Sequence, residues 1–384
     1  MEKSSPVRIL FTGGGSGGHT YPLLAVLQEM KRIAIERHLV AEFHYLGPID
    51  DFSIVLQNEG VEIHSLVAGK LRRYASILNV IDIPKFFIGA IQALAKLFTL
   101  MPDVVFSKGG TGALPVVISS WFYRIPVIIH ESDAAPGLTN LLSGKFSSRI
   151  AVSFDRALSY FNPQKTACIG APIRPALLSN RPEKETAKEE LGFNPKEPLV
   201  LILGGSQGSQ RIDEFIVSNL QGLIQTTQVL HQTGTANYAD TERLARAALA
   251  DVPVKTEVAH RYQAIGFLDQ NLKNALVAAD LVVSRAGSGT IFEIAAFGKP
   301  SILIPLLESA NNHQRINAYE FAKTGAAIVI EEENLLPGIF INQLRNVLKN
   351  KNLSNKMSIA AGQFFRSGAA EILAREIFRI ARTA

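Results

Sequence analysis

Four short apolar segments of this chain are each followed directly by a glycine-rich loop. The segments are residues 7–11, 103–106, 199–203 and 281–283, and their loops contain Gly13, Gly109, Gly204 and Gly287 respectively. A loop without bulky side chains lets backbone N–H groups approach a ligand, and the helix that follows adds unpaired N–H groups and partial positive charge. Strand, glycine loop and helix in this order are typical of nucleotide-binding α/β folds. Because the pattern occurs in both halves, we expect two Rossmann-like domains.

The length of the chain also favours two domains. With 384 residues it exceeds one typical core, and its 47% hydrophobic and 19% charged residues are typical of a globular protein. Residues 180–198 combine mixed charge with three prolines, which indicates a surface linker. We therefore expect a first domain over residues 1–178, a second over 179–363, and a C-terminal helix over 364–384 that packs back on the first domain.

The overall charge and the cysteine count exclude several classes of protein. The formal net charge is +5 without a long basic run or a nucleic-acid-binding motif, so we expect no nucleic-acid partner. A mildly basic chain still suits an anionic substrate or an anionic membrane surface. Its one cysteine, Cys168, excludes a disulfide framework and a multi-cysteine metal site, and its apolar surroundings predict an inert packing residue.

The apolar segments predict a cytoplasmic protein that touches a membrane, if at all, without crossing it. The first residues are polar and lead directly into a strand, so no signal peptide is expected. The apolar runs 86–100 and 113–129 contain Lys96 and Arg124, and neither gives a clean span of about 20 residues. Residues 69–100 leave two interpretations open: an amphipathic core helix, or a basic and apolar face that rests on an anionic membrane.

One stretch of the second half, residues 282–318, predicts a nucleotide-diphosphate site. Ser288, Gly289 and Thr290 lie at the mouth of a predicted helix, where unpaired N–H groups suit a diphosphate. Glu293 lies about one turn further into the helix, where a carboxylate can accept hydrogen bonds from a ribose diol. The alternative for this stretch is a solvated turn with an ordinary serine cap.

The first glycine loop fits a larger polar ligand better than it fits a dinucleotide. Gly13, Gly15 and Gly18 match the G-x-G-x-x-G fingerprint, but the next strand ends in Gly47 without the carboxylate that binds a ribose. His19 follows this loop, and two roles are open for it: a site residue that faces the reacting groups, or a satisfied structural residue.

Two further loops carry polar groups toward the same predicted edge of the sheet. Parallel strands end together, so residues 107–112 and 131–137 are expected near the first loop. His130 and Glu131 are either a catalytic pair or residues that orient these loops. Arg174, at the junction of the two halves, carries a permanent charge that suits a diphosphate.

Motifs with specific spacing cover nearly the whole chain. In order, they are GGGSGGHTYP (13–22), SKGGTGALP (107–115), HESDAAPGLTN (130–140), GAPIRP (170–175), GGSQGS (204–209), HQTG (231–234), SRAGSGTIFEIAAFGKP (284–300) and NHQRINA (312–318). As a set they resemble the MurG family of peptidoglycan N-acetylglucosaminyltransferases, which belongs to glycosyltransferase family 28.

The resemblance implies an α/β fold of the GT-B type, in which two Rossmann-like, doubly wound domains face a central cleft. It also implies transfer of GlcNAc with inversion from UDP-GlcNAc to the 4-hydroxyl of MurNAc in undecaprenyl-diphospho-MurNAc-pentapeptide (lipid I), which gives lipid II. The first domain would serve the acceptor and the membrane, and the second would bind UDP-GlcNAc. The enzyme would be peripheral at the cytoplasmic face of the cell membrane. No D-x-D motif is placed to hold a metal at the diphosphate, so we expect no cofactor and no obligatory ion.

The resemblance assigns substrate contacts to particular positions. In chain order they are Ser16, Gly17, Gly18, Gly109, Gly110, Asp133, Arg174, Ser206, Gln207, Leu268, Ser288, Gly289, Thr290, Glu293 and Gln314. Of these, Arg174 and Ser206 match contacts to the donor diphosphate, and Leu268 matches a residue whose backbone faces the uracil. Glu293 matches the ribose-binding glutamate, and Gln314 matches a contact to GlcNAc or its diphosphate.

Two positions depart from the family pattern. Asp133 follows Ser132 where the family commonly has Gln-Asn, and Thr111 stands where a tyrosine often follows the glycine pair. An acidic Asp133 could serve as a base, or it could reject part of the usual acceptor. The peptide or sugar details of the acceptor could differ accordingly.

The expected chemistry is a single in-line displacement at the anomeric carbon, with a base that takes the proton of the acceptor hydroxyl. His19 is the first candidate for this base, with Glu131 and Asp133 as alternatives. The leaving UDP gains charge, which Arg174, Ser206 and the helix mouth would stabilise. Two other functions stay open: a related GT-B transferase with another lipid acceptor, and a non-catalytic UDP-sugar-binding protein.

Overall fold

The computed structural model describes residues 6–14, 17–49, 51–69, 78–205, 208–250, 260–309 and 312–382. The chain divides into two compact units. Unit 1 consists of Met1–Pro175 and Arg366–Ala384, and unit 2 consists of Ala176–Phe365. Each unit is built around one β-sheet whose strand pairs are all parallel in the described part of the chain.

The sheet of unit 1 has the strand order β3-β2-β1-β4-β5-β6-β7. Its strands are β1 Val7–Thr12, β2 Ala41–Gly47, β3 Glu62–Ser65, β4 Val104–Ser107, β5 Val127–Glu131, β6 Arg149–Val152 and β7 Thr166–Cys168. The central strands are runs of β-branched and aromatic residues that are buried on both faces, as a parallel sheet between helices requires. The strand order reverses between β1 and β4, since β2 lies on the other side of β1.

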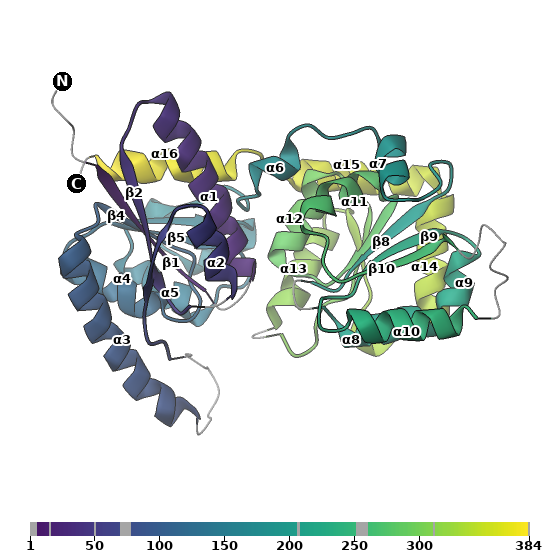
Figure 1. Cartoon of the computed structure of the whole chain (residues 1–384), viewed down its shortest axis with the longest axis horizontal. Helices are drawn as coiled ribbons and strands as arrows, with labels where there is room; N and C mark the ends of the chain where they lie inside the picture. Colours follow the sequence, from purple (N-terminus) through teal and green to yellow (C-terminus); the bar gives the residue numbers. More distant parts are fainter. Residues whose placement is uncertain are drawn as a thin grey trace. The chain divides into compact units, whose positions relative to one another are not determined.

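Helices cover both faces of this sheet (Figure 1). One face is covered by α1 (Gly17–Glu36), α2 (Asp51–Asn58) and α16 (Ala369–Ala381), and the other by α3 (Leu78–Leu100), α4 (Ala113–Phe122) and α5 (Leu138–Phe146). The short 3₁₀ helices η1 (Asp155–Tyr160) and η2 (Pro163–Lys165) connect β6 to β7.

The C-terminal helix α16 packs on α1, as Figure 1 shows in yellow and purple. Leu373, Ile377 and Phe378 repeat at helical spacing, and each is at most 2% exposed. They share a core with Met30 and Ile33 of α1. The end of the chain is therefore part of the hydrophobic core of unit 1.

Helix α3 combines a buried stripe with an exposed apolar stripe. Ala93 and Leu97 are fully buried, and a side chain at Gly89 would overlap the backbone carbonyl of Val67. By length and composition alone, the stretch Asp82–Leu100 could cross a membrane, with a mean hydropathy of 1.4 and 17% of it buried. The prediction of no clean span concerned residues 86–100, and the stretch found here begins upstream of that run, at Asp82. Its buried stripe nevertheless attaches it to unit 1.

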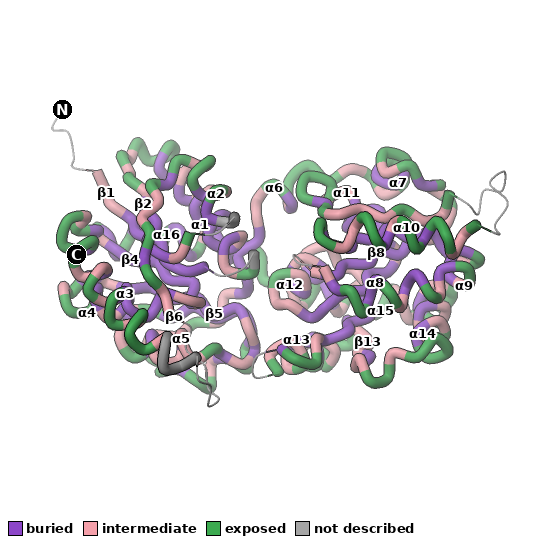
Figure 2. The backbone as a smooth tube through the Cα atoms, turned by 60° about the horizontal axis from the view of Figure 1, so that its bottom comes forward, coloured by how far each residue is buried: buried purple, intermediate pink, exposed green. Residues whose placement is uncertain are grey.

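The sheet of unit 2 has the order β10-β9-β8-β11-β12-β13 and reverses between β8 and β11. Its strands are β8 Leu199–Leu203, β9 Gln228–Gln232, β10 Tyr262–Ile265, β11 Leu281–Ser284, β12 Ser301–Leu303 and β13 Ala327–Val329. Its helices are α7 Lys184–Glu190, α8 Gln210–Ser218, α9 Leu220–Ile224, α10 Tyr238–Ala248, α11 Leu272–Ala278, α12 Ser288–Ala296, α13 His313–Ala322, α14 Pro337–Lys349 and α15 Lys351–Phe364, with 3₁₀ helices η4 Asp269–Asn271 and η6 Glu332–Asn334. Helix α6 (Pro175–Leu178) lies where the chain passes from unit 1 to unit 2. Figure 2 shows the buried strands inside each unit and the exposed outer faces of its helices.

Helix α1 begins at Gly17, so its first turn contains His19 and Pro22 lies inside the helix.

Candidate active site

The glycine loops of unit 1 follow the two strands between which the strand order reverses. β1 and β4 are neighbours, and the N–H of Lys108 donates to the carbonyl of Thr12 over 2.9 Å directly after the paired segment. The carboxyl ends of the strands at such a switch point are where open α/β sheets bind ligands. The sequence pattern therefore places its polar loops at the expected position in unit 1.

Three loops of unit 1 approach one another so closely that two positions require glycine. Gly110 has φ +84°, and a Cβ there would lie 2.5 Å from the carbonyl oxygen of Gly14 and 3.1 Å from Nε2 of His19. Gly109 has φ +78°, and its Cβ would lie 2.5 Å from Oδ1 of Asn140. Positive φ angles alone would strain a side chain at either position. The loops after β1, β4 and β5 therefore meet, and His19 lies against the second of them.

The predicted residues of the first loop lie at the start of α1. Gly17 and Gly18 are its first two residues, and His19 is in the same turn. Gly18 is exposed and His19 is half-buried. Ser16, which was predicted with them, lies outside the described residues.

Glu131 organises the loop that follows β5. Its carboxylate accepts hydrogen bonds from the N–H of Asp133 (2.8 Å), the N–H of Gly137 (3.2 Å) and Nδ2 of Asn140 (2.9 Å). The side chain is only 4% exposed. These contacts bind both ends of the loop to one carboxylate. The side chain of Asp133, which the loop carries, is half-buried.

A buried lysine neutralises part of this charge. Lys108 is 2% exposed, and its ammonium group donates to the hydroxyl of Ser132. Burial lowers the pKa of Lys108, and the charges of Glu131 and Asp133 oppose this effect. Burial also raises the pKa of Glu131, and the charge of Asp133 adds to that rise while Lys108 opposes it. The opposite charges of Lys108 and Glu131 thus offset part of the free-energy cost of burying each other.

His130 has a structural position. It is fully buried, and its Nε2 lies 3.2 Å from the carbonyl of Gly170 and 3.3 Å from Oγ of Ser153. Burial holds its pKa well below the usual value for histidine, so the ring is neutral. Of the two interpretations of the His130–Glu131 pair, the contacts favour orientation of the loops.

Arg174 contacts the first helix of its own unit. Its guanidinium carbon lies 4.6 Å from the centre of the Tyr21 ring. A guanidinium over an aromatic ring keeps its charge, which suits the predicted contact to an anion.

The two glycine loops of unit 2 follow β8 and β11, the neighbours at its own switch point. Gly208 has φ +79°, and a side chain there would overlap the carbonyl of Thr233. Helix α12 begins at Ser288 after a cap at Gly287, and this cap makes no side-chain hydrogen bond. A Cβ at Gly287 or Gly289 would meet no atom within 4 Å. No side chain caps this helix end at Gly287, and no neighbouring atom crowds its two glycines, as the approach of a phosphate group requires.

Two other predicted donor contacts lie on α12 and α13. Glu293 is half-buried and lies five residues after Ser288 on the same helix. The side-chain carbonyl of Gln314 accepts a hydrogen bond from the N–H of Leu306 over 3.0 Å. Gln314 thus holds the loop after β12 in place, and its contact to the sugar remains a prediction. Ser206 and Gln207 lie outside the described residues.

The backbone of Leu268 already makes hydrogen bonds on both sides. Its N–H donates to Oε1 of Gln232 over 3.1 Å, and its carbonyl accepts from the N–H of Asn271 over 2.7 Å. Gln232 also donates to the carbonyl of Gly205 over 3.2 Å. A carbonyl has a second lone pair, so the predicted uracil contact is compatible with the Leu268 oxygen but not with its engaged N–H.

Sequence reasoning missed four buried polar residues that hold these loops: Lys108, Asn140, Gln232 and Arg285. Arg285 is 7% exposed, donates to Oγ of Ser209 over 2.8 Å and pairs with Glu332. All four occur within the motifs quoted above, and Lys108 and Arg285 directly follow a buried strand, which was a usable signal. The partners of Lys108, Gln232 and Arg285 are remote in sequence and could not be inferred from spacing.

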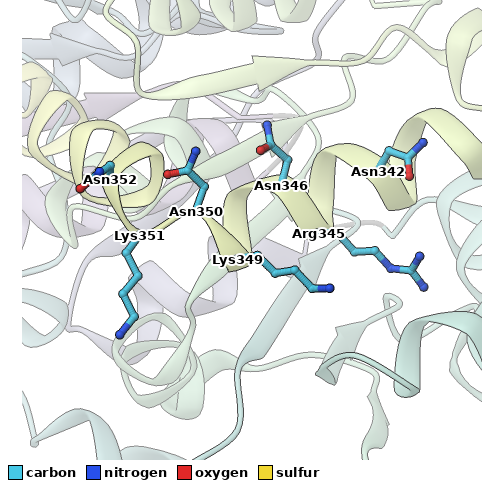
Figure 3. Close-up of a pocket in the computed structure, with 7 residues that line it drawn as sticks. All are labelled: Asn342, Arg345, Asn346, Lys349, Asn350, Lys351 and Asn352. Carbon is cyan, nitrogen blue, oxygen red and sulfur yellow. The ribbon is translucent and has the colours of Figure 1, made fainter.

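A hollow elsewhere in unit 2 has the wrong chemistry for this site. It lies along α14 and the start of α15 and is lined by Asn342, Arg345, Asn346, Lys349, Asn350, Lys351 and Asn352, as Figure 3 shows. This set contains no carboxylate or imidazole that could move a proton, and it includes none of the glycine loops.

These features define a class of protein: an α/β protein of the GT-B-like type, with two parallel Rossmann-like sheets and glycine loops at both switch points. The chain belongs to glycosyltransferase family 28. The N-terminal domain of this family matches residues 9–152, and its C-terminal domain matches residues 199–372.

Curated relatives of the chain share one named activity. The chain is 34% identical to the UDP-N-acetylglucosamine–N-acetylmuramyl-(pentapeptide) pyrophosphoryl-undecaprenol N-acetylglucosamine transferase of Clostridium tetani, over 91% of this chain and 93% of the relative. It is 35% identical to the enzyme of the same name from Legionella pneumophila, over 91% of each chain. The predicted membership of the MurG family is therefore confirmed.

Solved structures confirm the predicted fold. The crystal structure of Acinetobacter baumannii MurG has a TM-score of 0.74 at 24% identity, over 97% of this chain and 100% of that one. A UDP-GlcNAc 2-epimerase from Neisseria meningitidis bound to UDP-GlcNAc has a TM-score of 0.65 at 12% identity, over 97% and 100%. At identities this low, structural similarity shows the fold but does not identify the reaction.

Proposed function

We propose that this chain transfers GlcNAc from UDP-GlcNAc to the 4-hydroxyl of MurNAc in lipid I, with inversion, and so makes lipid II for peptidoglycan. The observation that carries this proposal is the 34% identity, over 91% of the chain, to transferases named for this reaction. The topology of each unit supports it, because each sheet has glycine loops at its switch point.

Unit 2 is the proposed donor half. The open N-terminus of α12 would bind the diphosphate through the N–H groups of residues 288–290, and Glu293 would accept hydrogen bonds from the ribose. Gln314 would contact the sugar, and the carbonyl of Leu268 would face the uracil. Arg174 and Ser206 would add positive charge and a hydroxyl at the diphosphate.

Unit 1 is the proposed acceptor half, and His19 is the proposed base. His19 is half-buried at a helix start and lies against Gly110, where a reacting group could approach. Glu131 is a poorer candidate, because its carboxylate is buried and accepts three hydrogen bonds from its own loop. Asp133 is the alternative candidate for the base. It lies at the start of the loop after β5, where its N–H donates to the carboxylate of Glu131. Glu131 and Lys108 would then position the loop that carries Asp133.

In the proposed step, the acceptor oxygen forms a bond to the anomeric carbon while the bond from that carbon to the diphosphate oxygen breaks. The hydroxyl proton passes to the base, and UDP leaves with the bonding electrons. The helix start of α12 and Arg174 would stabilise the charge that develops on the leaving diphosphate. No step needs a bound metal.

Helix α3 is the proposed membrane contact. Ile83, Phe87, Ile91 and Phe98 lie on its outer side and are 57%, 62%, 68% and 67% exposed. A helix that is anchored by one stripe and presents apolar side chains on the other suits the boundary between headgroups and acyl chains. The basic residues predicted to precede it, residues 70–73, lie outside the described residues. The protein would then be peripheral at the cytoplasmic face, where lipid I is presented.

Asp133 and Thr111 favour one alternative, a related transferase with another lipid acceptor. Both residues depart from the family pattern on the acceptor side, whereas the donor side matches it. A non-catalytic UDP-sugar-binding protein is the second alternative. It would have no use for His19 at the meeting point of the loops.

The experiment compares turnover and UDP affinity in the His19→Ala variant. We expect turnover to fall by about 10²–10⁴-fold, because a positioned base contributes that much, while the UDP dissociation constant changes by less than about twofold. Steady-state kinetics with a lipid I analogue and calorimetry with UDP measure the two quantities. His38→Asn, which removes an exposed histidine of the same unit, is the matched control. Equal losses of turnover and affinity would remove His19 from the chemistry, and absence of turnover in the unaltered protein would favour the non-catalytic alternative.

A further inference from the structure

Two histidines and a glutamate face one another at the edge of the unit 1 sheet. β3 is the edge strand and pairs with β2, with His44 opposite Glu62 and Leu46 opposite His64. Side chains alternate between the faces of a sheet, so His44, Leu46, Glu62 and His64 share one face. Leu46 belongs to the core beneath α3 and α4, and this identifies the face.

One ligand atom from each of the three residues lies within 4.8 Å of the others, and the closest contacts involve both carboxylate oxygens of Glu62. Nε2 of His64 lies 3.4 Å from Nδ1 of His44, and that nitrogen lies 3.2 Å from a carboxylate oxygen of Glu62. The other carboxylate oxygen of Glu62 lies 3.5 Å from Nε2 of His64. Ligands at about 2.0 Å from a tetrahedral zinc ion are about 3.3 Å apart, which is the spacing found here.

The surroundings match those of a metal-bound histidine. When Nδ1 of His44 binds a metal, its Nε2 carries the proton and needs an acceptor. That nitrogen is buried and makes no hydrogen bond, and the carboxylate of Glu42 lies 4.0 Å from it. The same Glu42 oxygen accepts a hydrogen bond from Nε of Arg8 over 3.3 Å, and its approach to His44 would complete the carboxylate–histidine–metal arrangement that orients ligands in metal sites.

Access and charge also suit a cation. The two imidazoles are each 10% exposed, whereas Glu62 is 64% exposed and opens the cluster to solvent. Glu62 supplies the negative charge of the cluster, whereas the carboxylate of Glu42 pairs with Arg8 over 3.3 Å.

We propose that His44, His64 and Glu62 form a three-ligand site for a divalent transition-metal ion such as zinc, with water as the fourth ligand. The ion would join the edge strand β3 to β2 through side chains, in addition to their backbone pairing. Imidazole and carboxylate ligands favour zinc, copper, nickel or iron over magnesium and calcium, which prefer oxygen. The site lies on the acceptor unit and takes no part in the proposed transfer.

The test is a zinc titration of the full chain after treatment with a chelator, followed by calorimetry and by the absorbance of bound cobalt. We expect one zinc ion per chain, a cobalt spectrum typical of low coordination number, and no binding of magnesium at the same concentration. Zinc should also raise the Tm of the apo protein, because it binds the folded state.

Two variants separate the site from incidental binding. His64→Gln should weaken zinc binding by about a hundredfold and abolish the zinc-dependent rise in Tm. Glu62→Gln is exposed and should fold in any case, and it should weaken zinc binding by about tenfold or more. His38→Asn is the control that removes an exposed histidine but no ligand, and it should bind zinc as the unaltered chain does. Equal zinc affinity in the unaltered, His64→Gln and Glu62→Gln proteins, or no binding in any of them, would leave only a hydrogen-bonded histidine pair and overturn the proposal.

Discussion

The polar residues around the first glycine loop differ in how deeply they are buried. The buried carboxylate of Glu131 accepts hydrogen bonds from two backbone N–H groups and from Asn140. The buried ring of His130 lies within hydrogen-bond distance of Gly170 and Ser153. Such side chains hold a loop in place and have little freedom to follow a proton. His19 and Asp133 are half-buried and lie at the edges of this network, which is where a reacting group can reach.

Glu293 provides a residue-scale prediction for the donor site. Glu293→Ala should weaken UDP binding by about 10–100-fold, the effect expected when a carboxylate that accepts hydrogen bonds is removed. Isothermal titration with UDP measures it, and Glu293→Gln should lose less because one acceptor oxygen remains. The control is Glu333→Ala, which makes the same charge change at an exposed position of the same unit. Unchanged affinity in Glu293→Ala would remove Glu293 from the ribose site.

Cys168 provides a prediction about pH. Burial, and then the charge of Asp155, raises the pKa of its thiol to about 11. A raised pKa keeps the thiol protonated, so the reactive thiolate becomes abundant only as the pH approaches that value. Alkylation by iodoacetamide at pH 8 should therefore be about 10²-fold slower than for a free cysteine, and it should accelerate about tenfold per pH unit up to pH 10.

Mass spectrometry of the intact chain follows this reaction directly, because Cys168 is the single cysteine. The urea-unfolded chain is the control and should react like a free thiol. Free-thiol kinetics in the folded chain at pH 8 would contradict the inert role.

The positions of site residues were predictable from the sequence where a motif determines them. The hydrogen-bond and ion-pair partners of these residues were not predictable. The loops with Gly109, Gly110 and Ser288 lie at strand ends because parallel strands end together, and this follows from the pattern alone. The contacts of Lys108 and Arg285 join segments that are distant in sequence. No local spacing encodes such pairs, so their roles became visible only in the structure.

At the scale of elements, the central strands were predictable, whereas the edge strands β3 and β13 were not. β1, β4, β8 and β11 are buried on both faces and form continuous apolar runs. β3 and β13 are short and only partly buried, so their alternation is too weak to distinguish them from a loop. Two of the three ligands of the proposed metal site, Glu62 and His64, lie on β3, and for that reason the site had no signal in the sequence pattern.

Helix α3 carries the element-scale prediction. The Phe87→Glu and Ile91→Glu variants should each reduce binding to anionic phospholipid vesicles by about tenfold, because each removes an apolar side chain from the interface and adds repulsion. Vesicle co-sedimentation measures the bound fraction. Both residues are exposed, so thermal unfolding should be nearly unchanged.

A matched control for α3 exists on the opposite face of the sheet. Ile35 of α1 is 76% exposed, and Ile35→Glu makes the same chemical change there. It should leave vesicle binding unaltered. Equal losses in all three variants would indicate a general charge effect, and no loss in any of them would remove α3 from the membrane contact.

At the scale of the whole molecule, the two units repeat one topology, with the glycine loops after the two strands between which each sheet reverses. The same fold occurs in a UDP-GlcNAc 2-epimerase and in MurG, so the architecture alone does not select the reaction. The family and the donor-site motifs narrow the chemistry to sugar transfer. The acceptor is the part of the proposal that rests most heavily on the curated relatives.

The most direct test is therefore the transfer of labelled GlcNAc from UDP-GlcNAc to a short-chain lipid I analogue by the purified chain. UDP-GalNAc in place of the donor and diacylglycerol in place of the acceptor are the controls. We predict label in the lipid II analogue from UDP-GlcNAc with lipid I, and background values in both controls. Intact UDP binding without transfer to lipid I would contradict the account, and transfer to diacylglycerol instead would identify a related transferase with another acceptor.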